Sequence, residues 1–176
     1  MPSGPFVLLQ VHKRSGTKTR GILRAGNFAF PVALGRSGIL ANKREGDGGT
    51  PRGRFRLKQL WWRQDRISRP RTALPTRAIR PDDAWSEDPS DRRYNRPVRR
   101  QPGETGDRLM RDDDLYDLII ELDHNDRPRI AGRGSAVFIH VARDGFKPTA
   151  GCIAFRRNDL LRLLERLGPR TQIVIS

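Results

Sequence analysis

Short apolar runs, separated by glycine, asparagine and proline, make up most of the hydrophobic pattern of the chain. Runs of about four to eight residues with such turn-forming neighbours are typical of β-strands. They predict strands at residues 6–11, 21–24, 28–34, 55–62, 116–123, 136–142 and 171–175. The run at 136–142 is apolar on both faces of a two-residue period, so we expect a strand that is buried on both sides.

One segment near the C-terminus has the spacing of an amphipathic helix instead. The leucines at 160, 163, 164 and 167 follow the i, i+3, i+4, i+7 spacing of one helix face. Asn158 precedes them as a candidate N-cap, and Gly168 and Pro169 follow as a stop signal. The pattern as a whole predicts a mainly β fold with one clear helix near the C-terminus.

Residues 63–113 interrupt this pattern with a polar stretch that is rich in arginine, aspartate and proline. An irregular segment of this length is uncommon inside a compact domain and is usually either functional or disordered. Its aromatic residues, Trp85 and Tyr94, favour an ordered, functional loop. We therefore predict a single domain over residues 1–176, in which residues 63–113 form a long irregular insertion that covers the substrate. The glycine-rich residues 35–55 lack the GxxxxGK[ST] pattern, so no phosphate-binding loop is predicted there.

The chain is strongly basic. It has 176 residues and a formal charge of +15, and 30 of its 35 cationic residues are arginine. A basic surface is typical of proteins that bind polyanions or acidic substrates, although the scattered arginines also fit a biased genome composition. One alternative is a nucleic-acid-binding module with an inert cysteine and with Trp61, Trp62 and Trp85 as stacking groups. The sequence has no RNA-binding aromatic motif and no recognition-helix pattern, so we expect no nucleic-acid partner.

The cysteine and histidine content excludes several kinds of site. A single cysteine, Cys152, rules out an internal disulfide framework and a multi-cysteine zinc site. His12, His124 and His140 show no metal-ligand spacing, so we predict no metal and no cofactor. No apolar run approaches the roughly 20 residues of a membrane span. Residues 6–9 are too short for a secretory signal, so the chain is cytoplasmic, leaves by an unrecognised route, or has a trimmed or misassigned start.

Cys152 and His140 together form the strongest chemical signal. Alone, a cysteine is usually a small buried hydrophobe, and a histidine in an apolar strand is usually satisfied by a backbone carbonyl. Gly151, however, leaves space for an incoming carbonyl and frees backbone N–H groups for an oxyanion. If the chain turns back after the strand through a loop of about nine residues, Cys152 begins the returning segment beside it. His140 would then make thiolate more available, accept the thiol proton and return it to a leaving amine.

These residues also resemble a known family. His140 followed by TAGCI at residues 149–153 is similar to the histidine and [ST]xGC[IV] signature of the L,D-transpeptidases, the YkuD-type catalytic domain. The segments that look like its small proteobacterial branch are GRSGI (35–39), EGDGGTPRGRF (45–55), W…YNRPV (85–98) and GSAVFIH (134–140). The likeness spans residues 6–176 and implies a YkuD-like catalytic domain with a β-sandwich or barrel-like sheet.

The resemblance implies a cysteine acyltransferase that cross-links peptidoglycan stem peptides. Cys152, assisted by His140, would attack the third-position diamino acid, expel the terminal D-alanine, and pass the acyl group from a thioester to an amine of a second stem. Backbone N–H groups of Gly151 and Cys152 would hold the oxyanion, and a backbone carbonyl would orient His140. With water as the acceptor, the same site would be an L,D-carboxypeptidase. Carbapenems would acylate the thiol, and the substrate implies the cell envelope or periplasm.

Two positions depart from the family pattern. The family usually has a histidine before the glycine and an arginine two positions after the cysteine, where this chain has Ala150 and Ala154. Arg143 or Arg156 is the expected replacement cation for a substrate carboxylate. The other candidates for substrate contacts are Thr149, His124, Tyr116, Trp85 and Tyr94.

Overall fold

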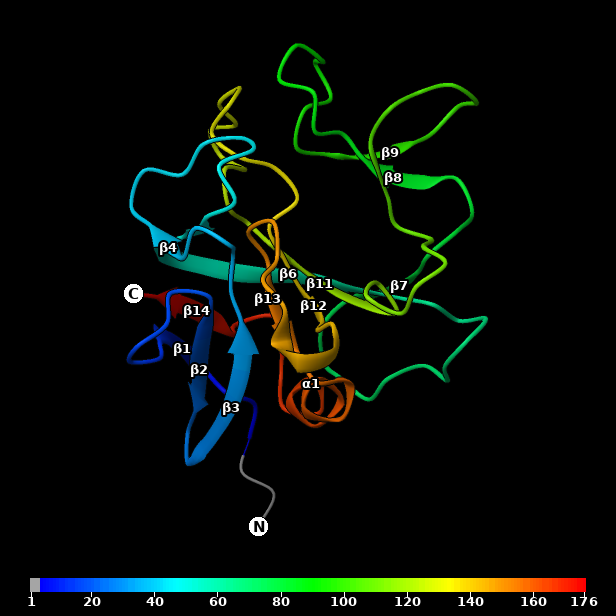
Figure 1. Ribbon diagram of the computed structural model, residues 1–176. Coiled ribbons are helices and arrows are strands. Elements are labelled where there is room, and N and C mark those ends of the chain that lie inside the picture. Colours follow the sequence, from blue (N-terminus) through cyan, green and yellow to red (C-terminus); the bar gives the residue numbers. More distant parts are fainter. Residues whose placement is uncertain (1–3) are drawn as a thin grey trace.

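A closed ring of eight strands forms the body of the structure, a computed structural model that describes residues 4–176 (Figure 1). Around the ring the strands follow the order β11, β12, β13, β3, β2, β1, β14 and β6, and pairing of β6 with β11 closes it. β7 (Thr76–Ala78) extends the sheet beside β6. The predicted mainly β, barrel-like fold is confirmed. The ring strands are Leu8–Lys13 (β1), Arg20–Ala25 (β2), Phe28–Ala33 (β3), Gly53–Trp62 (β6), Leu118–Leu122 (β11), Phe138–Val141 (β12), Ile153–Phe155 (β13) and Gln172–Ile175 (β14).

The strands predicted from the apolar runs are all present, and their ends differ from the prediction by at most two residues. β1, β2 and β3 form an antiparallel meander. β1 also pairs in parallel with β14, so the first and last strands lie side by side in the barrel wall. β13 has only three residues and no apolar run of its own, and the sequence indicated it only as the segment that follows Cys152.

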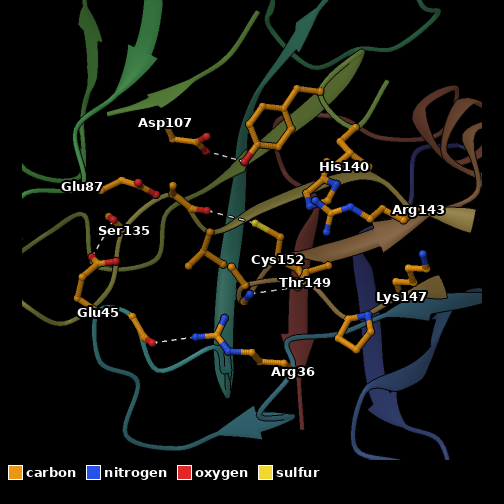
Figure 2. Close-up of a pocket in the computed structure, with 18 of the residues that line it drawn as sticks. Arg36, Glu45, Glu87, Asp107, Ser135, His140, Arg143, Lys147, Thr149 and Cys152 are labelled. Carbon is orange, nitrogen blue, oxygen red and sulfur yellow. Dashed lines mark hydrogen bonds between the residues drawn. The ribbon is translucent and has the colours of Figure 1, made fainter. Parts of the chain in front are cut away.

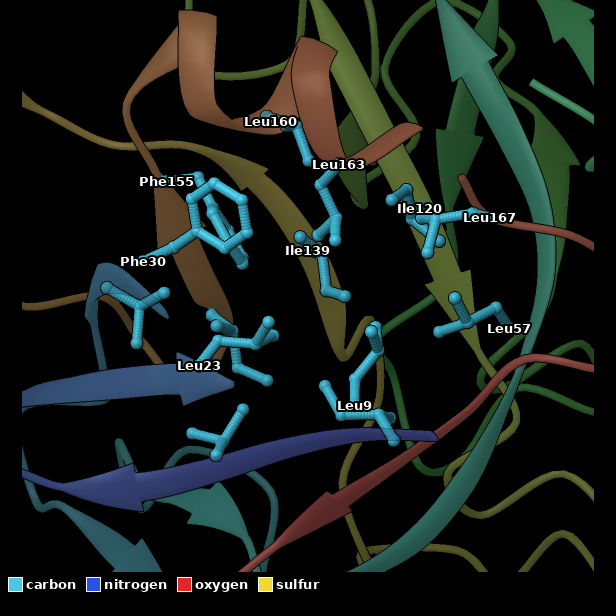
Figure 3. Packing of buried hydrophobic residues seen from close by; sticks show 14 of the residues in the cluster. Leu9, Leu23, Phe30, Leu57, Ile120, Ile139, Phe155, Leu160, Leu163 and Leu167 are labelled. Atoms are coloured by element: carbon cyan, nitrogen blue, oxygen red, sulfur yellow. The ribbon is translucent and has the colours of Figure 1, made fainter. Parts of the chain in front are cut away.

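The barrel interior holds most of the hydrophobic core. Along β11, Leu118, Ile120 and Leu122 belong to this inner cluster, whereas Ile119 belongs to a second cluster outside the barrel. The pleat of a strand imposes this two-residue alternation. Figure 3 shows apolar side chains from several strands converging on the leucines of the helix. Each such side chain, when fully buried, contributes about 1.5–3 kcal/mol of transfer free energy.

The helix α1 (Arg157–Leu164) packs its leucine stripe against the inner cluster, as predicted. The predicted N-cap is wrong, because Asn158 is the second residue of the helix, and Arg156 occupies the cap position without a side-chain hydrogen bond. β13 ends at Phe155, so only one residue separates the strand from the helix and no room remains for a later start. Within residues 4–176, no helix combines the length and the apolar character that a membrane crossing needs.

Residues 63–113 are more regular than predicted. They contain β8 (Asp83–Trp85), β9 (Pro97–Arg99) and β10 (Asp107–Arg108), which form an antiparallel sheet in the order β10, β8, β9. β8 and β9 lie to one side of the barrel strands (Figure 1). These strands have only two or three residues each, too few to show a hydrophobic period. The second cluster joins this insertion to the outer face of the barrel wall through Ile79, Trp85, Leu109, Trp61, Ile119 and Phe138.

Two of the three tryptophans that were candidates for stacking on nucleic-acid bases are buried. Trp61 is 0% exposed and donates its indole N–H to Glu121 at 3.2 Å. Trp85 is 4% exposed and donates to Asn95 at 3.0 Å. Because neither ring presents a face to solvent, the structure gives no support to the nucleic-acid-binding alternative.

Asp117 ties the insertion to the helix and is almost fully buried. Its backbone carbonyl accepts the N–H of Arg63 at 3.0 Å, and its carboxylate pairs with Arg66 at 2.8 Å and with Arg157. Asp117→Asn leaves both guanidinium groups without their anion. Because both are about one-third exposed, we expect the free energy of unfolding to fall by about 2 kcal/mol, less than for a fully buried pair.

Denaturant titration with an unchanged m-value measures this loss. Asp112→Asn makes the same change at a nearby exposed position that forms no ion pair within residues 4–176. Its free energy of unfolding should stay within about 0.5 kcal/mol of that of the unmodified protein. If Asp117→Asn were no more destabilising than this control, the structural role of the carboxylate would be disproved.

Candidate active site

Cys152 and His140 lie on the same outward face of the barrel wall, His140 on β12 and Cys152 directly before the neighbouring β13. β12 pairs in parallel with β13, with His140 opposite Ala154. Cys152 precedes Ala154 by two residues and therefore lies beside Phe138 on that face. From the sequence we expect the chain to turn back after β12 and to return antiparallel to it. Instead, the crossover loop at residues 142–152 carries the chain back to the start of β12, and β13 runs parallel to β12.

A pocket of about 390 Å³ opens beside these two side chains (Figure 2). Cys152 and His140 both line it. Its walls come from β12, the crossover loop, the glycine-rich residues 35–55 and the insertion. Four further residues that were predicted for the site also line it: Gly151, Thr149, Tyr116 and Arg143.

Backbone groups hold the Cys152 thiol. The thiol donates to the carbonyl of Ala136 at 3.2 Å, and the sulfur accepts the N–H of Phe138 at 3.4 Å. Only 8% of the residue is exposed, and this burial raises the pKa of the thiol to about 12. The sulfur makes no hydrogen bond to His140 within residues 4–176. At rest Cys152 is therefore a protonated thiol, in contrast to the more available thiolate expected from the sequence.

The His140 imidazole is oriented by its own strand. Nδ1 lies 2.8 Å from the carbonyl of Val141, so Nδ1 carries a proton and donates it, and Nε2 keeps its lone pair. Burial, assisted by the charges of Arg111 and Arg143, lowers the pKa of His140 to about 4. The Tyr116 ring packs edge-on against the imidazole, with centroids 5.4 Å apart. The resting form at pH 7 is therefore the neutral imidazole, and its protonated form is a stronger acid than an ordinary imidazolium.

Thr149 shapes the turn that presents the cysteine. Its hydroxyl donates to the carbonyl of Cys152 at 2.6 Å and accepts the N–H of Gly151 at 3.1 Å. Of the two predicted oxyanion donors, the Gly151 N–H is thus already bonded. The Cys152 N–H has no hydrogen-bond partner in the part of the chain that the structure describes, residues 4–176.

The glycine-rich residues 35–55 pack against the crossover loop. They contain β4 (Ile39–Leu40) and β5 (Thr50–Pro51), which pair in parallel. Gly35 forms a bridge with Thr149, and the carbonyl oxygen of Gly49 lies 2.7 Å from where a Cβ on Gly151 would be. Gly151 also has a φ of +146°, a region that side chains disfavour. Glycine is therefore required at position 151 for both contact and conformation.

The sequence model of the L,D-transpeptidase catalytic domain matches residues 11–175, nearly the whole chain. This chain belongs to the L,D-transpeptidase family. The resemblance drawn from the motifs is thus confirmed. L,D-transpeptidases are enzymes that act on peptidoglycan peptides of the cell wall. No curated protein and no solved structure matches the chain.

In this L,D-transpeptidase domain, Trp85 and Tyr94 support the pocket without lining it. The Trp85 indole donates to Asn95 Oδ1 at 3.0 Å, and the same oxygen accepts the N–H of Ala136 at 3.2 Å. Ala136 is the residue whose carbonyl binds the thiol. The Tyr94 hydroxyl donates to Glu45, which does line the pocket. The insertion thus positions the backbone around the L,D-transpeptidase cysteine.

The structure does not bring His124 and Arg156 to the pocket. Nε2 of His124 lies 3.1 Å from the carbonyl of Arg133. The guanidinium of Arg156 lies over the Phe146 ring, 5.1 Å from its centroid. Of the two arginines considered as replacements for the family cation, only Arg143 lines the L,D-transpeptidase pocket.

Several charged pocket residues were missed by sequence reasoning. Glu45 comes from the glycine-rich segment, Lys147 from the crossover loop, and Glu87, Asp107 and Arg111 from the insertion. Glu45 begins the family-like segment at 45–55 but was not singled out there, and the other four are ordinary charged residues in polar stretches. Because only the fold brings these segments together, no local sequence signal could have identified them.

Proposed function

We propose that this domain cross-links peptidoglycan stem peptides by acyl transfer through a thioester on Cys152, in the cell envelope. One observation carries the proposal: a single pocket contains the chain's only thiol and a neutral imidazole whose Nδ1 is fixed by a backbone carbonyl. That tautomer leaves Nε2 available to accept a proton. Membership of the L,D-transpeptidase family supplies the substrate class.

In the first half-reaction the thiol leaves the Ala136 carbonyl and turns toward Nε2 of His140. The thiol proton passes to Nε2 while the sulfur bonds to the carbonyl carbon of the third residue of the donor stem. The free N–H of Cys152 stabilises the oxyanion. The imidazolium then gives its proton to the departing nitrogen of the terminal D-amino acid, and the C–N bond breaks. A His140 pKa of about 4 favours this last proton transfer.

In the second half-reaction an amine of another stem attacks the thioester. A C–N bond forms, the C–S bond breaks, and His140 carries a proton from the attacking nitrogen to the sulfur. With water as the acceptor, the same steps would release a trimmed stem, as an L,D-carboxypeptidase does. We expect cross-linked dimers as the main product from isolated stems, and product analysis separates the two outcomes.

Arg143 and Lys147 are proposed to bind a carboxylate of the donor. In Figure 2 both lie on the same side of Cys152 as His140, and neither forms an ion pair within residues 4–176. His140 faces Ala154, whose methyl group occupies the position where the family usually has an arginine. The crossover loop would therefore supply the cation that the family pattern places after the cysteine.

A carbapenem is expected to acylate Cys152 and to add the mass of one drug molecule to the protein. The strained lactam carbonyl stands in for the stem carbonyl, and ring opening leaves a thioester on the sulfur. Intact-protein mass spectrometry measures the adduct. Cys152→Ala removes the only cysteine and should show no adduct. A folded wild-type protein that stays unmodified at saturating drug would argue against Cys152 as the nucleophile.

A further inference from the structure

Three acidic side chains line one side of the pocket, and two basic side chains that form no ion pair within residues 4–176 line the other. In Figure 2, Glu45, Glu87 and Asp107 lie on one side of Cys152, and Arg143 and Lys147 lie on the other. All five line the same pocket. A substrate that reaches the thiol therefore meets a negative wall and a positive wall at the same time.

The three carboxylates form no ion pair within the described residues, because the other cations that line the pocket have partners of their own: Lys43 pairs with Asp47, Arg111 pairs with Asp113, and Arg36 donates to the carbonyl of Gly46. The structure contains 13 ion pairs within residues 4–176, and none of them includes Glu45, Glu87 or Asp107. Cations are not scarce, because the chain has 35 cationic residues and 20 acidic ones. Three carboxylates that lie beside the thiol without an ion pair therefore favour a bound molecule that carries a positive charge.

Asp107 is linked to His140 through Tyr116. One of its oxygens accepts the Tyr116 hydroxyl at 2.6 Å, and the Tyr116 ring packs against His140. Burial raises the pKa of the Asp107 carboxyl. Glu87 makes no side-chain hydrogen bond within residues 4–176. Desolvation at the pocket wall raises the pKa of Glu87 to about 7, and the charges of Asp107 and Glu45 add to this effect. Part of the Glu87 side chain is still exposed to solvent.

We propose that Asp107, supported by Tyr116 and flanked by Glu87, binds the ammonium group of the acceptor and so favours an amine over water. This inference rests on the proposed acyl transfer at Cys152. It makes Asp107 a specificity-determining residue for the second half-reaction. The basic wall keeps the donor carboxylate, so donor and acceptor approach the thioester from opposite sides.

The proton balance assigns a second task to the same carboxylate. An acceptor that arrives as an ammonium loses two protons before the amide product forms. One passes to the Asp107 carboxylate and then to solvent, which leaves a neutral amine. The second leaves the attacking nitrogen for Nε2 of His140 and reaches the sulfur as the C–N bond forms and the C–S bond breaks.

Two small nucleophiles test the charge recognition directly. Glycinamide is largely an ammonium at neutral pH and carries no carboxylate, whereas hydroxylamine is uncharged. With isolated tetrapeptide stems as donors, Asp107→Asn should capture glycinamide about tenfold more slowly than the wild type does, as expected for the loss of one charge-assisted hydrogen bond. The ratio of the glycinamide rate to the hydroxylamine rate should therefore fall about tenfold. A general distortion of the site would slow both nucleophiles equally.

Two further variants show whether the change in the rate ratio comes from the pocket carboxylates or from a general loss of folding. Glu87→Gln alters an exposed side chain without hydrogen bonds and should lower glycinamide capture about threefold relative to hydroxylamine. Asp112→Asn, outside the pocket in the same insertion, should leave the ratio of the two rates unchanged. An unchanged ratio in Asp107→Asn and Glu87→Gln, while the wild type forms the acyl-enzyme, would overturn the acceptor site alone. Failure of the wild type to form an acyl-enzyme would overturn the proposed function as well.

Discussion

Replacing His140 with glutamine is expected to slow acylation of Cys152, by a stem peptide or a carbapenem, by about 10²–10⁴-fold, the usual contribution of a positioned general acid–base group. Glutamine can neither accept the thiol proton nor protonate the departing nitrogen. The same variant should leave alkylation of the thiol by iodoacetamide unchanged, because the resting thiol is hydrogen-bonded to the Ala136 carbonyl rather than to His140. Single-turnover mass spectrometry measures the first rate, and alkylation kinetics measure the second.

The pH dependence of alkylation distinguishes a neutral thiol from a thiolate paired with an imidazolium. Since burial raises the pKa of Cys152 to about 12, the thiolate fraction should rise about tenfold per pH unit from about pH 7 to about pH 10. A thiolate–imidazolium pair would instead give a plateau at low pH that disappears in His140→Gln, and that result would contradict the neutral pair. The exposed His12, outside the pocket, provides the control variant His12→Gln.

Gly151→Ala is expected to lower the free energy of unfolding by about 2–4 kcal/mol and to abolish acylation. The added Cβ would lie 2.7 Å from the backbone oxygen of Gly49, and the φ of +146° disfavours any side chain. Relief of the contact would move Cys152 relative to His140. Denaturant titration and acylation by a carbapenem measure the two effects.

Gly145→Ala is a control that separates the cost of a positive φ from the cost of the close contact with Gly49. Gly145 lies in the same loop with a φ of +72°, and a Cβ there would meet nothing within 4 Å. Its substitution should cost about 1 kcal/mol and leave acylation intact. If Gly151→Ala were no more harmful than Gly145→Ala, the close approach of the glycine-rich segment would not constrain the active site.

The barrel strands and the Cys152–His140 pair could be predicted because both leave local signals. Each long strand has an apolar run, and the pair lies in a motif that combines a buried polar side chain with a glycine-preceded thiol. Orientation of His140 by a backbone carbonyl, which the family resemblance implied, is also present. These features depend on residues that are near each other in the sequence.

The rest of the site could not be predicted because it depends on contacts across the fold. The parallel direction of β13 is set by where the crossover loop re-enters the sheet, and a three-residue strand carries no sign of direction. The protonation state of Cys152 follows from desolvation, which sequence spacing does not report. Asp107 and Arg111 line the pocket only because the insertion folds back over the barrel wall.

The two ends of the insertion meet at the seam that closes the barrel. Trp62 at the end of β6 pairs with Leu118 at the start of β11, and Arg63 is hydrogen-bonded to Asp117. The intervening segment therefore leaves the barrel wall and returns to it at neighbouring positions of β6 and β11. The segment covers the pocket without changing the order of the barrel strands. A change in this segment therefore acts on the pocket wall through Glu87 and Asp107, and on the thiol through Asn95, which holds the Ala136 backbone.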